Sequence, residues 1–449
     1  MGTRAVLSGT TRHAVVVVVV AVVCGATASV GQTPLTLADA MRRARDATPA
    51  ARAVAAASEA AGARVGQARA GYFPRIDLTE SVQRGNQPVF VFGSLLSQQR
   101  FTAANFAIDA LNRPAAVTSV RTAVSVEQPL FDAGATRLAV ENAELGRDLV
   151  AVSGAGTRQD LALAAADAFL RVLQLESAAR AHQAAVEAAG SDLARARARH
   201  GVGLITDADV LDMEVHLADM RERQLAAAAD LAVARFQLND AIGAPLDDLQ
   251  ALVAPDVSSV TSPPAEPLIR EALASRSDRH EADLHVALAA NARRSAQAAF
   301  LPRVSVQGGW EFNGRGFTDQ RSSWVVGAEM QVNLIRGFGD VARLAEARHA
   351  EAGAQAERDR VERAIEVAVR GARARLDAAR GRERVGREAL AQARESQRII
   401  RDRYEGGLAT IADVLRAAGA VVDAESRAIA AGVDVIRQTV ALDRAVGRL

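Results

Sequence analysis

The chain of 449 residues contains no lysine, a single cysteine and only 4% aromatic residues. All 54 basic residues are therefore arginines, and 53 acidic residues leave a net charge of +1, which gives no electrostatic case for a nucleic-acid partner. We attribute the missing lysine to genomic base composition. The shortage of aromatics argues against an enzyme with a large packed core. Abundant alanine with only 12 prolines favours long helices instead.

Long hydrophobic runs are also missing, except at the N-terminus. Arg4 and Arg12 precede an apolar run over residues 14–23, and Ala26-Thr27-Ala28 forms a small-residue cleavage site. This is the pattern of a secretory signal peptide, which we assign to residues 1–28. The run is too short to anchor the chain, and no later run approaches ~18 residues. We therefore expect an exported protein without a transmembrane helix.

The only cysteine, Cys24, lies inside this segment. It follows Val23, whereas a lipoprotein site requires Gly, Ala or Ser at that place. This favours ordinary cleavage near Ala28 or Gly31 over lipidation of Cys24. The cleaved chain would then contain no disulfide.

The sequence contains an internal repeat. RHGVGLITDADVL at 199–211 returns as RYEGGLATIADVL at 403–415, an offset of 204, and YFPRIDL at 72–78 returns as FLPRVSV at 300–306, an offset of 228. The first copy therefore holds about 24 extra residues between these motifs. We predict a first repeat over 33–247, a Pro/Ser-rich linker over 248–265 and a second repeat over 266–449.

Both repeats show the same order of elements. A helix (about 35–71 and 266–299) precedes two segments of alternating apolar and polar residues, which predict strands of ~10 residues. A loop joins the strands, longer in the first copy (about 85–116) than in the second. A helix of about 65 residues follows, then the repeated turn, then a shorter helix. In the first copy this last helix has a coiled-coil seam with 3–4 spacing, formed by Val210, Met213, Leu217, Met220, Ala227, Leu231, Ala234 and Leu238.

The repeated turn combines a helix stop with a helix start. Gly203 and Gly407 fit a left-handed residue that ends a helix, and Leu204 and Leu408 fit the apolar contact that often accompanies such an ending. Thr206 and Thr410 then fit N-caps, each with an aspartate three residues later. The turn is thus the bend of a long antiparallel hairpin. It is matched more closely between the copies than the helices that lead into it, which suggests that the bend touches a partner.

The strands point to an outer-membrane barrel. An exported chain with amphipathic strands of about ten residues and no apolar helix has the sequence pattern of a protein that crosses the outer membrane as a β-barrel. Four strands cannot close a barrel, since single-chain barrels begin at eight, and open edges are unsatisfied in lipid. Several chains must therefore share one barrel, and helices of ~100 Å beneath it would form a tube.

At this point the chain resembles the TolC-like outer-membrane efflux protein family. The resemblance rests on LTLADAMRRA at 35–44, the YFPR and FLPR strand starts, EQPLFDAG at 127–134 and the paired turns, and it covers nearly all of the mature chain. It implies a mostly helical homotrimer with a shared twelve-stranded β-barrel and a coiled-coil α-barrel that crosses the periplasm. It also implies partners, namely a periplasmic adaptor and an inner-membrane pump, with the adaptor docking at the hairpin tips.

The resemblance also implies roles for residues of the turns. Docking falls on Gly203, Leu204, Thr206, Gly407, Leu408 and Thr410, and candidates for the lining of the entrance are Asp209, Tyr404, Asp413 and Arg416. Two positions depart from the family pattern. Ala409 stands where an arginine locks the closed state, and Arg416 replaces a second acid. We expect Asp413 and Arg416 to pair with each other instead.

No motif for catalysis, a cofactor or a metal emerges. His280, Glu281 and His285 have the spacing HExxxH, which does not place two histidines on one helix face as zinc requires. The basic runs RARARH (195–200) and RGRERVGR (380–387) are interpreted as solvated helix surface. The leading hypothesis is thus a passive exit duct for an efflux or type I secretion system, not an enzyme. The alternative is a periplasmic coiled-coil scaffold without a pore, and the cargo is left open among drugs, metal ions and polypeptides.

Overall fold

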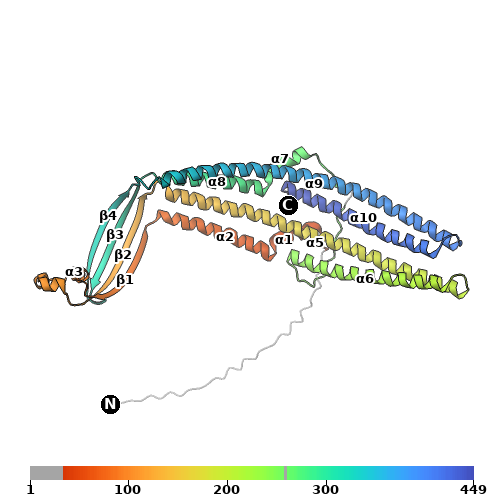
Figure 1. The fold of residues 1–449 in the computed structure, drawn as a ribbon, viewed down its shortest axis with the longest axis horizontal. Helices are drawn as coiled ribbons and strands as arrows, with labels where there is room; N and C mark the ends of the chain where they lie inside the picture. Colours follow the sequence, from red (N-terminus) through yellow and green to blue (C-terminus); the bar gives the residue numbers. More distant parts are fainter. Residues whose placement is uncertain (1–33, 257–259) are drawn as a thin grey trace, which may run out of the picture.

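The computed structural model describes residues 34–256 and 260–449. The predicted signal peptide and Cys24 lie outside these residues. The molecule is elongated, with a four-stranded sheet towards one end and two long helical hairpins extending to the other (Figure 1). In the described part of the chain, no helix has both the length and the apolarity needed to cross a bilayer.

The two long hairpins repeat at an offset of 204 residues. Helices α5 (Ala135–Gly201) and α9 (Gly339–Glu405) have 67 residues each, and α6 (Asp207–Ile242) and α10 (Ile411–Val446) have 36 each. The predicted length of about 65 residues for the first helix of each hairpin is therefore confirmed, and so is the shorter helix after each turn. Helix α5 packs against both α6 and α10, so α6 and α9 form the outer sides of this layer.

The helix that opens each repeat is broken in two, which the sequence analysis did not predict. In the first copy, α1 (Leu37–Asp46) precedes α2 (Pro49–Arg69), and Thr48 caps α2 with a hydroxyl that accepts a hydrogen bond from the Ala51 amide. A short 3₁₀ turn, η1 (Ala70–Tyr72), leads from α2 into the sheet.

The corresponding break in the second copy lies at Arg276, between α7 (Ala265–Ser275) and α8 (Ser277–Ala298). There Arg276 and Ser275 donate hydrogen bonds to the carbonyls of Ala445 and Val446 at the end of α10. The break thus satisfies carbonyls that the helix end would leave without a partner.

The four strands form one antiparallel sheet in the order β1-β2-β3-β4. Strand β1 (Arg75–Gly85) pairs with β2 (Val117–Phe131), β2 pairs with β3 (Arg303–Gly314), and β3 pairs with β4 (Gln320–Gln331). All four predicted strands are confirmed. The segment predicted as a loop in the first copy instead contains α3 (Pro88–Ser97), the 3₁₀ turn η2 (Ala103–Phe106) and α4 (Ile108–Asn112).

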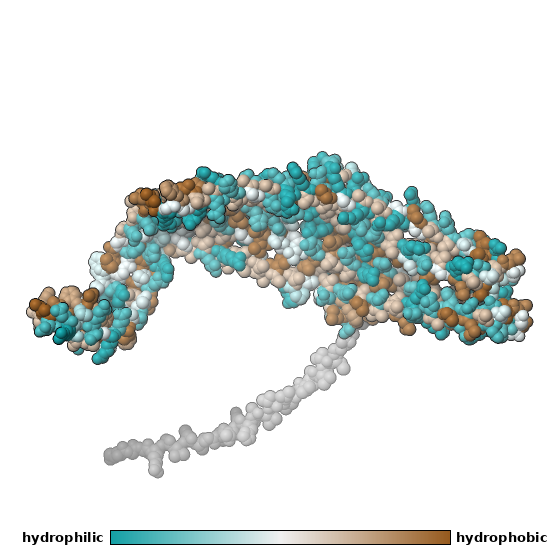
Figure 2. All heavy atoms as spheres, in the orientation of Figure 1, coloured by the Kyte–Doolittle hydropathy of each residue, from teal (hydrophilic) through white to brown (hydrophobic). Residues whose placement is uncertain are grey.

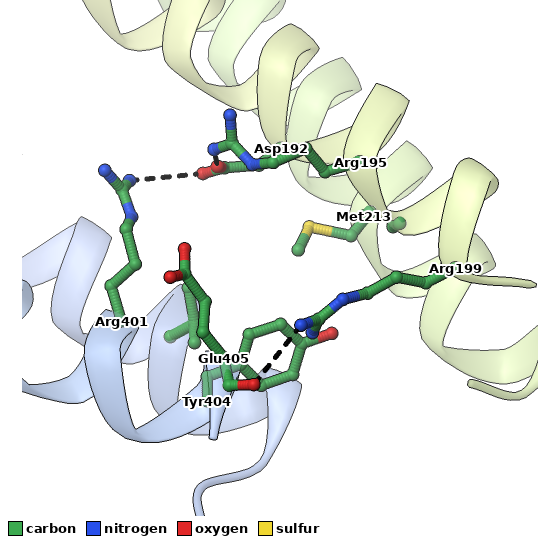
Figure 3. A pocket seen from close by; sticks show the side chains of 9 residues that line it. Asp192, Arg195, Arg199, Met213, Arg401, Tyr404 and Glu405 are labelled. Atoms are coloured by element: carbon green, nitrogen blue, oxygen red, sulfur yellow. Dashed lines mark hydrogen bonds and ion pairs between the residues drawn. The ribbon is translucent and has the colours of Figure 1, made fainter. Parts of the chain in front are cut away.

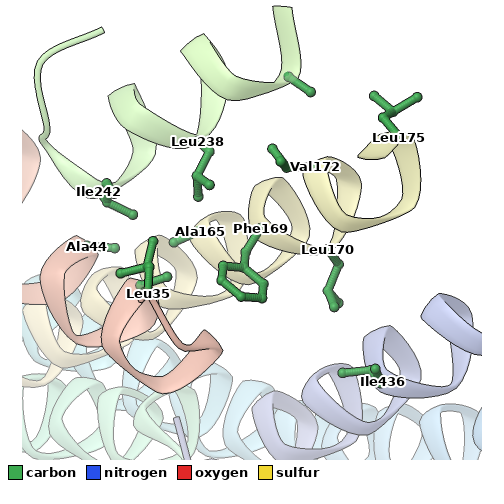
Figure 4. Close-up of a cluster of buried hydrophobic side chains, with 12 residues drawn as sticks. Leu35, Ala44, Ala165, Phe169, Leu170, Val172, Leu175, Leu238, Ile242 and Ile436 are labelled. Atoms are coloured by element: carbon green, nitrogen blue, oxygen red, sulfur yellow. The ribbon is translucent and has the colours of Figure 1, made fainter. Parts of the chain in front are cut away.

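The buried core is a series of clusters along the helices. One lies where α1, α5, α6 and α10 meet (Figure 4), and Phe169 and Leu170 are completely buried there. The predicted seam of α6 faces inward, since Met213, Leu217 and Leu238 are buried. Leu35 joins this cluster and exchanges backbone hydrogen bonds with Ala251 and Val253, so part of the predicted linker packs against the first repeat.

Candidate functional site: the hairpin tips and the sheet

The first tip ends α5 with a Schellman motif. Gly203 has a φ of +76°, which L-residues with a side chain rarely adopt. Its amide donates to the His200 carbonyl at 2.8 Å, and the Leu204 amide donates to the Arg199 carbonyl at 3.0 Å. The predicted left-handed stop at Gly203 is confirmed.

The second tip repeats this geometry. Gly407 has a φ of +75°. Its amide donates to the Tyr404 carbonyl at 3.1 Å, and the Leu408 amide donates to the Arg403 carbonyl at 2.8 Å. Two different sequences thus form the same bend at equivalent places, and both bends lie at the end of the molecule far from the sheet (Figure 1).

A reciprocal capping box starts the helix after each bend. The Asp209 amide donates to the Thr206 hydroxyl, and the Thr206 amide donates to the Asp209 carboxylate at 2.9 Å. Thr410 and Asp413 form the same pair of contacts in the second tip. The predicted caps are confirmed, and the two acids have structural partners within their own helix.

The leucines of the tips do not make the predicted contact with their own helix. Leu204 is 71% exposed and Leu408 is 72% exposed. The bend directs each side chain outward, and Val202 beside Leu204 is exposed as well. Each tip therefore exposes an apolar side chain. The hydrogen bonds of the Schellman motif join backbone atoms, so they do not require a leucine at this position.

Arg416 pairs with Asp413 as expected, with Nη1 at 3.1 Å from Oδ1. The hydroxyl and amide of Thr410, and then the Arg416 guanidinium, hold the pKa of the Asp413 carboxyl below its ordinary value. The pair lies at the surface, so its contribution to stability is small. Asp413 is therefore a charged capping residue at the tip.

The two hairpins touch each other just behind the tips, around a cavity of about 170 Å³ (Figure 3). The Arg199 guanidinium lies 5.2 Å from the centre of the Tyr404 ring and donates to the Glu405 carbonyl. Arg401 pairs with Asp192 at 3.5 Å. Two arginines, one from each hairpin, thus bridge α5 and α9 through a cation–π contact and an ion pair.

Tyr404 is half buried at this cavity, and its hydroxyl is buried without a hydrogen-bond partner among the described residues. The sequence analysis singled out Tyr404 but not Arg199, Asp192 or Arg401. The interpretation of RARARH as solvated surface is confirmed for Arg195 and Arg197, whose side chains are 57% and 60% exposed, and is wrong for Arg199, which contacts Tyr404. Arg199 lies one turn before the first bend, and Arg403 lies at the equivalent place before the second. An arginine at this place in both repeats was the signal that could have identified Arg199 as a tip residue.

The first tip also carries a pair that has no counterpart in the second. His200 Nε2 lies 2.6 Å from Asp207 Oδ1 and links the end of α5 to the start of α6. At an offset of 204 the second tip has Tyr404 and Ile411 in these places. The two tips therefore share a backbone shape but differ in side-chain chemistry.

The sheet has one apolar face. Cross-strand neighbours on that face are mainly hydrophobic, for example Leu78 beside Val124 and Trp310 beside Trp324. The large side chains of this face remain exposed in the single chain, including Ile76, Leu78, Trp324, Val326 and Met330. The opposite face is mainly polar and includes an ion pair between Arg121 and Glu311. A sheet with this division suits lipid on one side and water on the other.

Among the described residues, no cluster of three or more His, Cys, Asp or Glu side chains is arranged to hold a metal. His280 instead lies 3.1 Å from the Ala274 carbonyl. The features that recur in both repeats are structural turns, apolar tips and an amphipathic sheet.

These features define a class, the outer-membrane channels with a periplasmic helical extension. The family model described as "Outer membrane efflux protein" matches residues 40–244 and 268–448, so the chain belongs to this family. The match covers both repeats and omits the segment between them.

Individual relatives agree with this assignment. The "Outer membrane protein TolC" of Vibrio cholerae is 23% identical over 303 residues, which are 66% of this chain and 69% of that protein. The crystal structure of VceC, also from Vibrio cholerae, has a TM-score of 0.73 and 18% identity, with coverage of 92% of this chain and 96% of that one. The open state of MtrE from Neisseria gonorrhoeae has a TM-score of 0.73 and 15% identity, covering 92% and 88%.

The chain is therefore an outer-membrane efflux duct that extends into the periplasm. The alternative of a scaffold without a pore is set aside, because it gives no role to a sheet with one mainly apolar, exposed face. The family transports rather than catalyses, in agreement with the absence of a catalytic motif in the sequence.

Proposed function

We propose that three copies of this chain close one twelve-stranded barrel. The observation that carries the proposal is the open sheet, in which β1 and β4 each have one edge without a neighbouring strand among the described residues. Unpaired backbone groups are costly in lipid, and four strands are too few to close on themselves. Pairing β1 of one copy with β4 of the next removes every edge.

The apolar face of the sheet supports this membrane position. At its helical end lie exposed aromatic residues that include Phe73, Phe131 and Phe300, and Trp310 and Trp324 form a second belt further along the strands. Aromatic residues at two levels along the strands are typical of the outward face of an outer-membrane barrel.

The outer helices of the layer also present side chains for a neighbouring copy. Helix α6 exposes a row of apolar residues on a side that no described helix covers, comprising Leu211, Val215, Leu225, Val233 and Phe236. Helix α9, at the opposite side, exposes Val367, Val385 and Ile399. Contact between α6 of one copy and α9 of the next would bury both rows and continue the helical layer into a closed tube.

We further propose that the tips receive the periplasmic adaptor of an inner-membrane pump, which supplies the energy. The residues concerned are those of the two bends: Gly203, Leu204, Thr206, Gly407, Leu408 and Thr410. What supports this is that the bends hold Leu204 and Leu408 outward at equivalent places, where an apolar groove of a partner can cover them.

The entrance between the tips is closed at rest by the contacts of α5 with α9. With Ala409 and Arg416 in place of the arginine and the acid of the family pattern, Asp192 and Arg401 hold the hairpins together, and so do Arg199 and Tyr404. Asp209, Asp413 and Arg416 line the entrance. Separation of these contacts on docking opens the duct.

The test is the double variant Leu204→Asp and Leu408→Asp, assayed by export in cells that carry the cognate pump. Both side chains are exposed, so the heat-sensitive trimer is expected to survive while export falls at least tenfold. Leu249→Asp, at an exposed leucine outside the tips, serves as the control and leaves export unchanged. Normal export in the double variant would remove the docking proposal while leaving the trimer proposal intact.

A further inference from the structure

The extra residues of the first repeat form a small folded unit, which we call the cap and define as residues 88–116. It contains α3, η2 and α4 and joins β1 to β2 at the end of the sheet far from the tips (Figure 1). The second repeat has no such unit, because only residues 315–319 join β3 to β4.

The cap is held to the sheet by a buried polar anchor. Gln98 is 1% exposed, and its amide donates to the Thr118 carbonyl of β2 at 3.0 Å. Arg100 donates to the Gln98 side-chain oxygen at 2.9 Å. The ring of Phe101 packs edge-on against Phe92 and Phe106, with centroids 4.7 and 5.1 Å apart. This segment is therefore a structured unit rather than a plain loop.

The surface of the cap is unusually apolar for an extracellular position. Val89 is 78% exposed and Ile108 is 76% exposed, and Leu96 and Phe106 are also exposed. The space-filling view shows hydrophobic residues at this end of the molecule (Figure 2). Beside these side chains lies a cleft of about 380 Å³, lined mainly by apolar residues that include Val91, Phe92, Leu95, Phe101 and Leu111. The same unit thus carries both apolar projections and an apolar cleft.

A cluster of polar side chains lies between the lipid-facing band and this surface. Beyond the belt of Trp310 and Trp324, the outward face of the strands becomes mixed, with Glu80, Thr122 and Gln320 among Phe312 and Val82. Thr122 donates to Glu80 at 2.6 Å and accepts a hydrogen bond from Gln320 at 3.1 Å on that face. These hydrogen-bonded polar groups would be costly in hydrocarbon, so we place the cap beyond the lipid-facing band and expect its apolar surface to be covered by protein.

We propose that the caps of three copies contact one another and form a collar around the outer end of the barrel. The proposal rests on the trimer proposed above. The cap directly follows β1, an edge strand, so it lies next to the junction with the neighbouring copy. Projections of one cap entering the cleft of the next form a heterologous contact, which closes as a ring under three-fold rotation.

Charge does not oppose this contact. Within residues 88–116 the charged side chains are Arg100, Asp109 and Arg113, which leave a net charge of +1 per cap. Arg113 lies at the rim of the cleft. Repulsion among three such caps is small at physiological ionic strength, where charges more than ~8 Å apart are screened.

The test is photocrosslinking of the full-length protein in its membrane. Phe106 or Ile108 is replaced in turn by p-benzoylphenylalanine, and Trp310 is replaced in a control. Trp310 is also exposed but faces outward from the central strand β3. After irradiation, the cap probes are expected to give covalently joined chains whose linked peptide maps to residues 88–116 of the partner copy. The Trp310 probe is expected to give none.

Two other results are distinguishable. Intact trimers in which both cap probes react only within their own chain or with lipid would overturn the collar and leave the channel unaffected. If no trimer forms in any variant, the control included, both the collar and the trimer on which it rests are wrong.

Discussion

At the scale of single residues, the tips depend on two glycines in the left-handed region. A Cβ at Gly203 or Gly407 would touch no neighbouring atom within 4 Å, so the cost of substitution is purely conformational. For an L-residue that cost is ~1–2 kcal/mol per position. A substitution at either glycine therefore measures the cost of backbone strain alone, without a contribution from side-chain packing.

We expect Gly203→Ala and Gly407→Ala each to lower the free energy of unfolding of the hairpin by about 1 kcal/mol. Gly62→Ala is the matched control, because Gly62 lies within α2 and also has open space around it. That change should raise stability, since alanine is the better helix former. Hydrogen exchange at the tips measures the effect, and equal behaviour of all three variants would refute the role of the left-handed turn.

Asp413 makes the stability of the second tip depend on pH. Its folded-state pKa lies below the ordinary value, chiefly because of hydrogen bonds from Thr410. Its stabilisation is therefore complete above the unfolded-state pKa and is lost as the pH falls below ~4. Hydrogen exchange of the α10 N-terminus, corrected for intrinsic rates, should show this loss on going from pH 6 to pH 3. The loss should shrink in Asp413→Asn, and an unchanged loss would assign it to another group.

At the scale of elements, we propose that the contacts between α5 and α9 decide how firmly the entrance closes. Asp192 binds both Arg195 of its own helix and Arg401 of α9. We expect Asp192→Ala to raise single-channel conductance while the trimer persists, because each of the two partly exposed pairs that it removes contributes at most ~1 kcal/mol to stability. Asp230→Ala, at an exposed aspartate of α6, is the control. Equal conductance in the two variants would contradict closure at this place.

The sequence predicted the elements well where periodicity or duplication carried the signal. The two long hairpins repeat exactly, and their caps follow from Thr206 and Thr410 with their aspartates. The break before α2 was missed, although Thr48 followed by Pro49 is a local start signal. The break at Arg276 has no such signal, because its hydrogen bonds go to residues about 170 positions later in the chain. The same reason hid the contact of Arg199 with Tyr404. The cap was missed although Pro88 is a local signal for a helix start.

At the scale of the whole molecule, the single chain is incomplete. Its sheet has two open edges, one face of that sheet is apolar and exposed, and the outer helices carry exposed apolar rows. Assembly of three copies resolves all of these features at once. The proposed collar of caps and the proposed closed tips would place a structured element at each end of one continuous duct.

The most direct test of this account is the single-channel conductance of the purified protein in a planar bilayer, together with its oligomer size before and after heating. We expect a heat-dissociable trimer with a small conductance, because the contacts between α5 and α9 close the tips. A trimer with a large, stable conductance would contradict closure at the tips. A monomer that stays in the soluble periplasmic fraction and shows no conductance would contradict the central claim.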